Sequence, residues 1–143
     1  MNTYLGLDIG DVRIGVAKTD ALGMFASSYE VIDRNKINPF QRIYEIIKEE
    51  KVCALVVGQP KTKDGQNAIQ VEKVEKFITE LKELIGEEFK VYYVDERYTT
   101  KEAEYYLKNF SKKNGKERRK VVDMVAATII LQNFLDSNNK FKK

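Results

Sequence analysis

Four carboxylates lie at the end of an apolar segment or within one, and an acid at the end of a strand can face a ligand. Asp8 ends the first apolar segment, Asp95 and Glu96 end a later one, and Asp123 lies among valines and a methionine. Oxygen ligands of this kind suit Mg²⁺ or Mn²⁺. Two such ions, about 3.5–4 Å apart, can activate a water and stabilise the leaving oxygen of a phosphodiester. If the first and last strands are near one another, the four acids predict a metal-dependent hydrolase site.

Each acid also has a structural explanation when it is considered alone. Asp8 could be a solvated turn residue, and Asp95 could cap the following helix or pair with Arg97. Asp123 could be an acid favoured by the dipole at a helix N-terminus. Its apolar neighbours argue against full exposure, because a buried charge without a partner is costly. The catalytic hypothesis therefore depends on the whole set of acids.

The composition excludes several kinds of chemistry. The chain has no histidine, which excludes Ser-His-Asp and Cys-His catalysis and histidine-ligated zinc. Cys53 is the single cysteine, so an internal disulfide is impossible, and we expect it to be a small buried apolar residue. No apolar run approaches the ~20 residues of a membrane span, and the N-terminus does not resemble a signal peptide. We therefore expect a cytoplasmic protein.

Positive charge is concentrated late in the chain. The net charge is +3, but residues 101–143 contain 11 Lys and Arg against 5 Asp and Glu. Six of these cations form a run with one acid, and the run leads directly to Asp123: Lys112, Lys113, Lys116, Arg118, Arg119 and Lys120. Such a run could be a solubilising loop, or it could hold phosphates beside a metal site.

The elements that must position these residues begin with an antiparallel meander. The apolar segments Tyr4–Ile9 and Ile14–Ala17 flank a turn containing Gly10 and Asp11, which are typical hairpin residues. A third strand is predicted at Phe25–Ile32.

Alternating helices and strands are predicted next. Asn38 is a good N-cap before Pro39 at the first turn of a helix. The continuous apolar run Ala54–Gly58 is typical of a strand covered on both faces. A helix follows over Gln66–Ile85 and a strand over Lys90–Asp95.

The last third is predicted to be helical around one loop. Thr99 opens a capping box for a helix that ends near Lys108. Asn109–Arg119 reads as a basic loop, and Val121–Leu135 as a largely buried helix. The order of elements predicts one α/β domain over residues 1–143, with a mixed sheet flanked by helices.

Four stretches together resemble a known family: GLDIGDVRIGVAKTD, ALVVGQPKTKDGQ, VDERYTT and KVVDMVAATIILQ. In this order they are similar to the YqgF family of pre-16S rRNA nucleases, relatives of RuvC-type (RuvX) Holliday-junction resolvases. The resemblance implies an RNase H-like fold with a five-stranded sheet, made of a three-stranded meander and two parallel strands.

The resemblance also implies a function and a set of site residues. It implies a two-metal nuclease that uses Mg²⁺ or Mn²⁺, with Asp8, Glu96 and Asp123 as catalytic metal ligands. Its substrate would be precursor rRNA, cut to form the 5′ end of 16S rRNA in ribosome biogenesis. Five cations are candidates for contacts to the nucleic-acid backbone: Arg13, Arg97, Arg118, Arg119 and Lys120. Between Asp95 and Glu96, strand alternation should decide which one faces the metals.

Three other functions fit parts of the same pattern. A resolvase of branched DNA would need a homodimer to cut two strands symmetrically. A non-catalytic RNA-binding factor would use the basic run alone. The stretch DIGDVRIGVA also resembles the phosphate loop of sugar kinases, although such an enzyme needs two domains. For the metal site, we expect the small residues Gly10 and Gly15 to let a nucleic-acid backbone approach Asp8.

Overall fold

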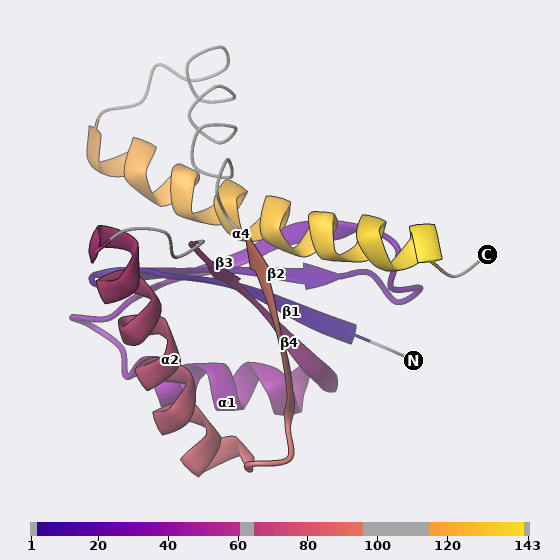
Figure 1. Ribbon diagram of the computed structural model, residues 1–143, viewed down its shortest axis with the longest axis horizontal. Coiled ribbons are helices and arrows are strands. Elements are labelled where there is room, and N and C mark those ends of the chain that lie inside the picture. Colours follow the sequence, from indigo (N-terminus) through magenta and orange to yellow (C-terminus); the bar gives the residue numbers. More distant parts are fainter. Residues whose placement is uncertain (1–2, 61–64, 96–114, 142–143) are drawn as a thin grey trace.

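The computed structural model describes residues 3–60, 65–95 and 115–141. Within these ranges it describes every side chain except those of residues 65–67, 115–120 and 138–141. The elements in these ranges are shown in Figure 1 and follow in the order β1 (Thr3–Ile9), β2 (Arg13–Thr19), β3 (Ala26–Asp33), α1 (Pro39–Glu49), β4 (Val52–Gln59), α2 (Gly65–Ile85), β5 (Lys90–Asp95) and α4 (Gly115–Phe141).

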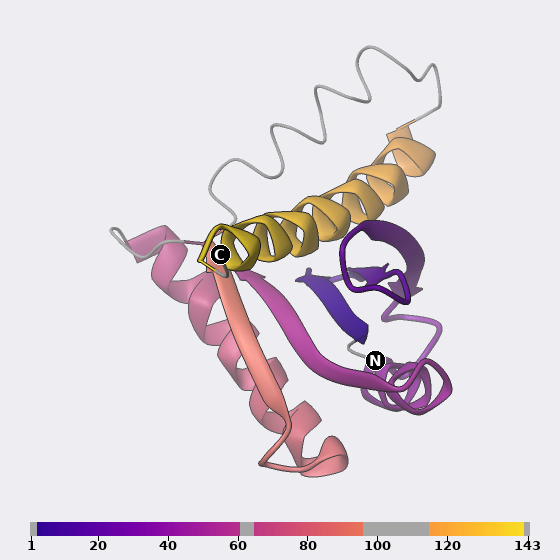
Figure 2. The ribbon, with the colours of Figure 1, turned by 90° about the vertical axis from the view of Figure 1, so that its right-hand side faces the viewer.

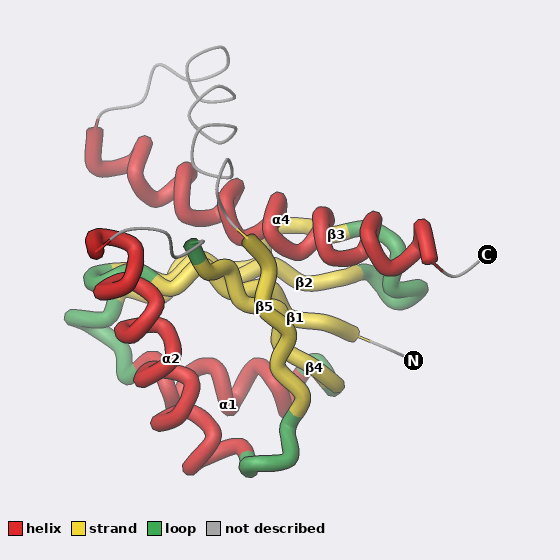
Figure 3. Tube along the Cα trace, viewed as in Figure 1, coloured by secondary structure: helices red, strands yellow, loops and turns green. Residues whose placement is uncertain are grey.

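The strands form one mixed sheet in the order β3-β2-β1-β4-β5 (Figure 3). β2 pairs antiparallel with β1 and β3, because tight links join the meander, whereas β4 is parallel to β1 and β5 across the helical crossovers. The predicted meander with two parallel strands is therefore confirmed. β1 occupies the centre of the sheet, which places Asp8 between two neighbouring strands.

The two faces of the sheet are covered by different helices. α1 and α2 lie on one face and α4 crosses the other (Figures 1 and 2). Strand alternation divides β1 accordingly, since Leu5, Leu7 and Ile9 pack in the core with α1 and α2. Gly6 and Asp8 point to the side of α4. Asp8 therefore shares its face of the sheet with the helix that carries Asp123.

α1 begins where its sequence predicted. The Asn38 side chain accepts hydrogen bonds from the backbone N–H groups of Phe40 (3.0 Å) and Gln41 (3.2 Å), and Pro39 occupies the first turn. These bonds satisfy amides that have no partner inside the helix. Ile43 and Ile46 are then buried against the sheet.

α4 approaches the sheet at two glycines. A Cβ on Gly6 would lie 2.8 Å from Leu131 Cβ and 3.1 Å from the Ala127 carbonyl oxygen. A Cβ on Gly15 would overlap the backbone carbonyl of Asp123. The two glycines therefore let the helix backbone come closer than any side chain would allow.

Two expectations are wrong, and a third concerns residues that the structure does not describe. The last helix begins at Gly115 and not at Val121, so the end of the predicted basic loop is helical. Cys53 is exposed, not buried, because it alternates with the buried Val52 and Ala54 on β4 near the sheet's end. The helix predicted from Thr99 lies outside the described residues. Among the helices that the structure does describe, none has the length and apolar character required to span a bilayer.

Gly15→Ala should destabilise the protein by about 1–3 kcal/mol, because the added methyl group forces α4 away from β2. Gly6→Ala is the matched control on the neighbouring strand, and it should cost less, since its Cβ would lie 2.8 Å from Leu131 Cβ, whereas a Cβ on Gly15 would overlap a backbone carbonyl. Urea unfolding of both variants measures the difference. Equal stability of Gly15→Ala and the wild type would contradict the observed packing.

Candidate active site

Asp8 lies beside Gly15, one of the two glycines where α4 contacts the sheet, and the backbone of Asp123 lies over the same glycine. Asp8 is the register partner of Gly15 in the antiparallel pair of β1 and β2. Partners in such a pair share a face and have Cα atoms about 4.5–5.5 Å apart. The carbonyl of Asp123 lies directly over Gly15. The fold therefore brings these two acids to the same place, although they belong to the first and last described elements.

Asp123 has one ion-pair partner among the described residues, Arg13. The Arg13 Nε donates a hydrogen bond to the Asp123 Oδ2 at 2.7 Å. The side chains are 23% and 22% exposed, so the pair is largely shielded from water. Burial raises the pKa of the Asp123 carboxyl above its usual value, and the hydrogen bond and charge of Arg13 partly offset this rise.

The alternation of β5 shows on which face of the sheet one of the two candidate acids, Asp95, lies. Val91 packs on the side of α1 and α2, whereas Val94 packs on the side of α4. By alternation, Asp95 belongs to the face of Val91, opposite to Asp8. The exposed Asp95 is therefore on the wrong face to join Asp8 and Asp123 directly. Glu96 lies outside the described residues.

The turn after Asp8 is held from three directions. The Gly10 N–H donates to the Arg13 carbonyl (3.0 Å), and a Cβ on Gly10 would lie 2.7 Å from that oxygen. The Arg34 Nη1 donates to the Gly10 carbonyl at 2.7 Å, and Lys73 of α2 pairs with Asp11 at 3.3 Å. The turn is thus fixed against both β3 and α2.

These contacts revise the expected role of the two glycines. Gly10 closes the hairpin and Gly15 accommodates α4, so protein atoms fill the space that we expected nucleic acid to use. Sequence reasoning also missed Arg34, which belongs to none of the four motifs. Its guanidinium also lies 5.1 Å from the centre of the Phe77 ring. A lone arginine just after a strand carries no signal that could have revealed this contact.

The donor chemistry of Asp8 and Asp123 suits a hard divalent cation. Both offer carboxylate oxygens, the preferred ligands of Mg²⁺ and Mn²⁺. In the part of the chain that is described, no three Asp, Glu or Cys residues gather as a complete metal site. The predicted third ligand, Glu96, belongs to residues 96–114, outside the described ranges.

The other predicted cations are placed only in part. Arg118, Arg119 and Lys120 lie in the first turns of α4, and their side chains are outside the described part. These turns are on the N-terminal side of Asp123, at the Asp8 end of the sheet (Figure 1). Arg97 lies outside the described residues. For Arg118, Arg119 and Lys120, the structure thus gives only the course of the helix backbone.

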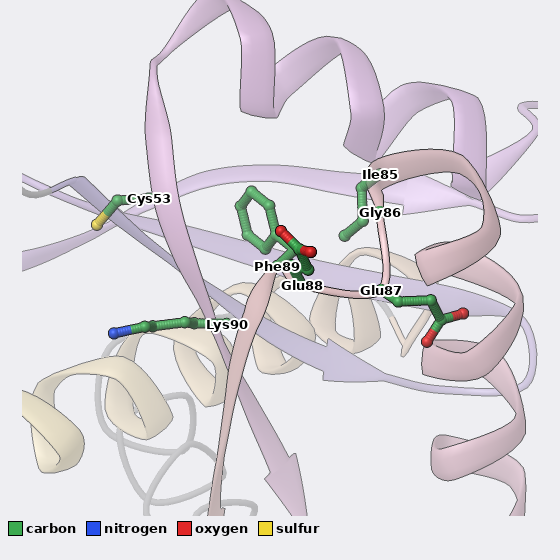
Figure 4. A pocket seen from close by; sticks show the side chains of 7 residues that line it. All are labelled: Cys53, Ile85, Gly86, Glu87, Glu88, Phe89 and Lys90. Carbon is green, nitrogen blue, oxygen red and sulfur yellow. The ribbon is translucent and has the colours of Figure 1, made fainter.

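A hollow of about 580 Å³ lies away from this site. It is lined by Cys53 at the start of β4 and by residues 85–90 between α2 and β5 (Figure 4). Because β4 and β1 are parallel, this hollow is at the opposite end of the strands from Asp8. It therefore takes no part in the site of Asp8 and Asp123.

Sequence comparisons relate the chain to one family over almost its whole length. The family RuvX, described as Holliday junction resolvase, matches residues 2–137. A protein of Fusobacterium nucleatum named "Putative pre-16S rRNA nuclease" is 49% identical over 136 residues, covering 95% of this chain and 98% of that protein. A protein of the same name from Ligilactobacillus salivarius is 36% identical and covers 100% of this chain and 98% of its own length.

Solved structures share the fold at much lower identity. RuvC of Thermus thermophilus, solved with a Holliday junction substrate, has a TM-score of 0.55 at 14% identity and covers 97% of this chain and 96% of its own. The fowlpox virus resolvase, solved with Holliday junction DNA, has a TM-score of 0.56 at 13% identity, over 95% and 98% of the two chains. The predicted RNase H-like fold is confirmed.

Arg34→Met should destabilise the protein by about 1.5–3 kcal/mol, because the Gly10 carbonyl loses a charged hydrogen-bond donor. Lys73→Met is the matched control at the same turn. The Lys73–Asp11 pair is more than half exposed on both sides, and exposed pairs contribute only about 0–1 kcal/mol. Chemical denaturation measures both effects, and a larger loss for Lys73→Met would refute the assigned bracing role of Arg34.

Proposed function

Since the chain belongs to the RuvX family, whose fold and relatives are those of nucleases, we propose that it cleaves phosphodiester bonds at the site of Asp8 and Asp123 with two divalent metal ions. One observation carries the proposal: Asp8 is paired with Gly15, and Asp123 of α4 lies over that glycine. The juxtaposition joins two of the three acids expected to bind metal.

The third ligand in this proposal is Glu96. Asp95 belongs to the face of the sheet opposite to Asp8, which favours the next residue along the chain. Asp8, Glu96 and Asp123 would then hold Mg²⁺ or Mn²⁺. When bound, such ions supply an activated water and stabilise the charge of the leaving oxygen.

The protein's own contribution is positioning and shielding. The braced hairpin turn fixes the backbone that follows Asp8, and the contact of α4 with Gly15 fixes the backbone of Asp123. Arg97, Arg118, Arg119 and Lys120 are proposed to contact the nucleic-acid backbone. The helical path of residues 115–120 supports this for the last three, because it carries them at the Asp8 end of the sheet.

We propose precursor 16S rRNA as the substrate, and therefore a cytoplasmic location. The support is the name shared by relatives that are 36–49% identical over nearly the full chain. Cleavage would form the 5′ end of the small-subunit RNA during ribosome assembly. Sequencing of rRNA ends in cells depleted of the protein tests this, and unchanged 16S ends would contradict it.

A branched-DNA resolvase is the second candidate. The family's description and the two solved resolvases with Holliday junctions favour it. Symmetric cleavage of a junction would require a homodimer, whereas cleavage of precursor rRNA is compatible with a monomer. Cleavage assays with a DNA junction and a precursor-rRNA mimic, together with sedimentation analysis, separate the two functions.

Asp8→Asn and Asp123→Asn should each lower metal-dependent cleavage by at least about 100-fold, because even outer-shell partners of a metal contribute about 10- to 100-fold. Asp11→Asn is the matched control, since Asp11 lies on the same hairpin and is 66% exposed. Its cleavage rate should stay close to that of the wild type. Circular dichroism checks that all three variants are folded.

The substrate can be the precursor-rRNA mimic or the DNA junction, provided that contaminating nucleases are removed. Full activity of a folded Asp8→Asn protein would refute the proposed site. Loss of activity in Asp11→Asn as well would show that the hairpin's general charge, and not the metal site, is responsible.

A further inference from the structure

We propose that Arg13 and a divalent metal ion are alternative counter-cations of Asp123, so that the guanidinium competes with the metal for this carboxylate. The inference rests on the proposed function, because it takes Asp123 to be a metal ligand. It assigns Arg13 a role different from the phosphate contact that its sequence predicted. Arg13 becomes a residue that sets how tightly the metal is held.

The first support is the position of the ion pair. The Arg13 Nε lies 2.7 Å from the Asp123 Oδ2, and each side chain is less than a quarter exposed. A carboxylate shielded to this extent needs a cation, because removing one partner of such a pair leaves an uncompensated charge. In this structure that cation is Arg13.

The second support is the contrast with Arg42, which also forms a short, shielded ion pair. Arg42 pairs with Glu30 at 2.6 Å and also lies within 4.0 Å of Glu45 and Glu49. Among the described residues, Arg13 pairs with Asp123 alone. A guanidinium surrounded by three acids has a structural role, whereas one that pairs with a single acid can be replaced when another cation binds that acid.

The third support is the attachment of Arg13. It is the first residue of β2, and its carbonyl accepts the Gly10 N–H across the hairpin turn. Its backbone is thus fixed by contacts that do not involve the guanidinium. The long side chain can leave Asp123 without disturbing the sheet.

Competition follows from the charges. A divalent ion at Asp123 and a guanidinium on the same carboxylate repel each other across a short, poorly hydrated distance. Each cation must then weaken the binding of the other by the same factor, since coupling between two ligands is reciprocal. Removing the positive charge of Arg13 should therefore tighten metal binding and weaken the metal-free fold.

The test measures Mn²⁺ binding to the full chain without nucleic acid, by isothermal titration calorimetry, and thermal unfolding with and without Mn²⁺. Arg13→Gln should bind Mn²⁺ about tenfold more tightly than the wild type, a change within the usual range of site coupling. Its melting temperature should fall without metal and recover more than that of the wild type when Mn²⁺ is added. Arg13→Met should behave in the same way.

Arg42→Gln is the matched control, because its ion pair is equally short and equally shielded. It should lower the melting temperature and leave the Mn²⁺ affinity unchanged. Unchanged or weaker Mn²⁺ binding in Arg13→Gln would overturn the inference. Arg13 would then serve only the fold, or would help the metal to bind.

Two outcomes separate this inference from the proposed function. If Asp123→Asn binds Mn²⁺ as tightly as the wild type, the proposed metal site itself fails, and the inference fails with it. If Asp123→Asn loses binding but Arg13→Gln does not gain it, only the inference fails. If both Arg13 variants are unfolded without metal, folding on addition of Mn²⁺ supports the exchange, and failure to fold at any Mn²⁺ concentration overturns it.

Discussion

The close contact between α4 and Gly15 is the constraint on which the site depends. No side chain larger than hydrogen fits between the β2 backbone and the Asp123 carbonyl. Because Gly15 is also the partner of Asp8 in the sheet, the same contact brings the two acids together. A movement of α4 away from the sheet would therefore disturb the packing and the proposed metal site at once.

Electrostatics around this contact follow from burial. Asp123 lies where water has limited access, so its charge depends on a nearby cation. The hairpin supplies that cation through Arg13, and the same turn is held in place by Arg34. Backbone position and charge compensation are thus provided by one short segment, residues 10–13. In the exchange proposed above, a metal ion can replace this counter-cation.

The fold is shared by proteins whose sequence identity to this chain differs widely. Relatives from distant bacteria retain 36–49% identity over nearly the whole chain. The two resolvases share only 13–14% identity, yet their TM-scores show the same arrangement of strands and helices. The same fold can therefore be built from very different sequences, because packing tolerates many apolar residues.

Local interactions made much of this protein predictable from its sequence alone. The hairpin, the cap at Asn38 and the strand Lys90–Asp95 depend on neighbouring residues, and each was found where it was predicted. The types of the acids indicate a metal site, and that site stays a prediction. The long helix α4 was predicted too short, because its first turns contain basic residues that show no apolar periodicity.

Only the tertiary structure decided which residues meet. Arg13 and Asp123 are 110 residues apart in the sequence, and nothing local to either one indicates their pairing. The close packing at Gly15, the bracing by Arg34 and the exposure of Cys53 also depend on sheet register and on where a helix crosses it. A shift of one residue in register would exchange the two faces of a strand. The sequence by itself therefore determined the elements and the chemistry of the acids, whereas register and helix packing decided which acids share a face.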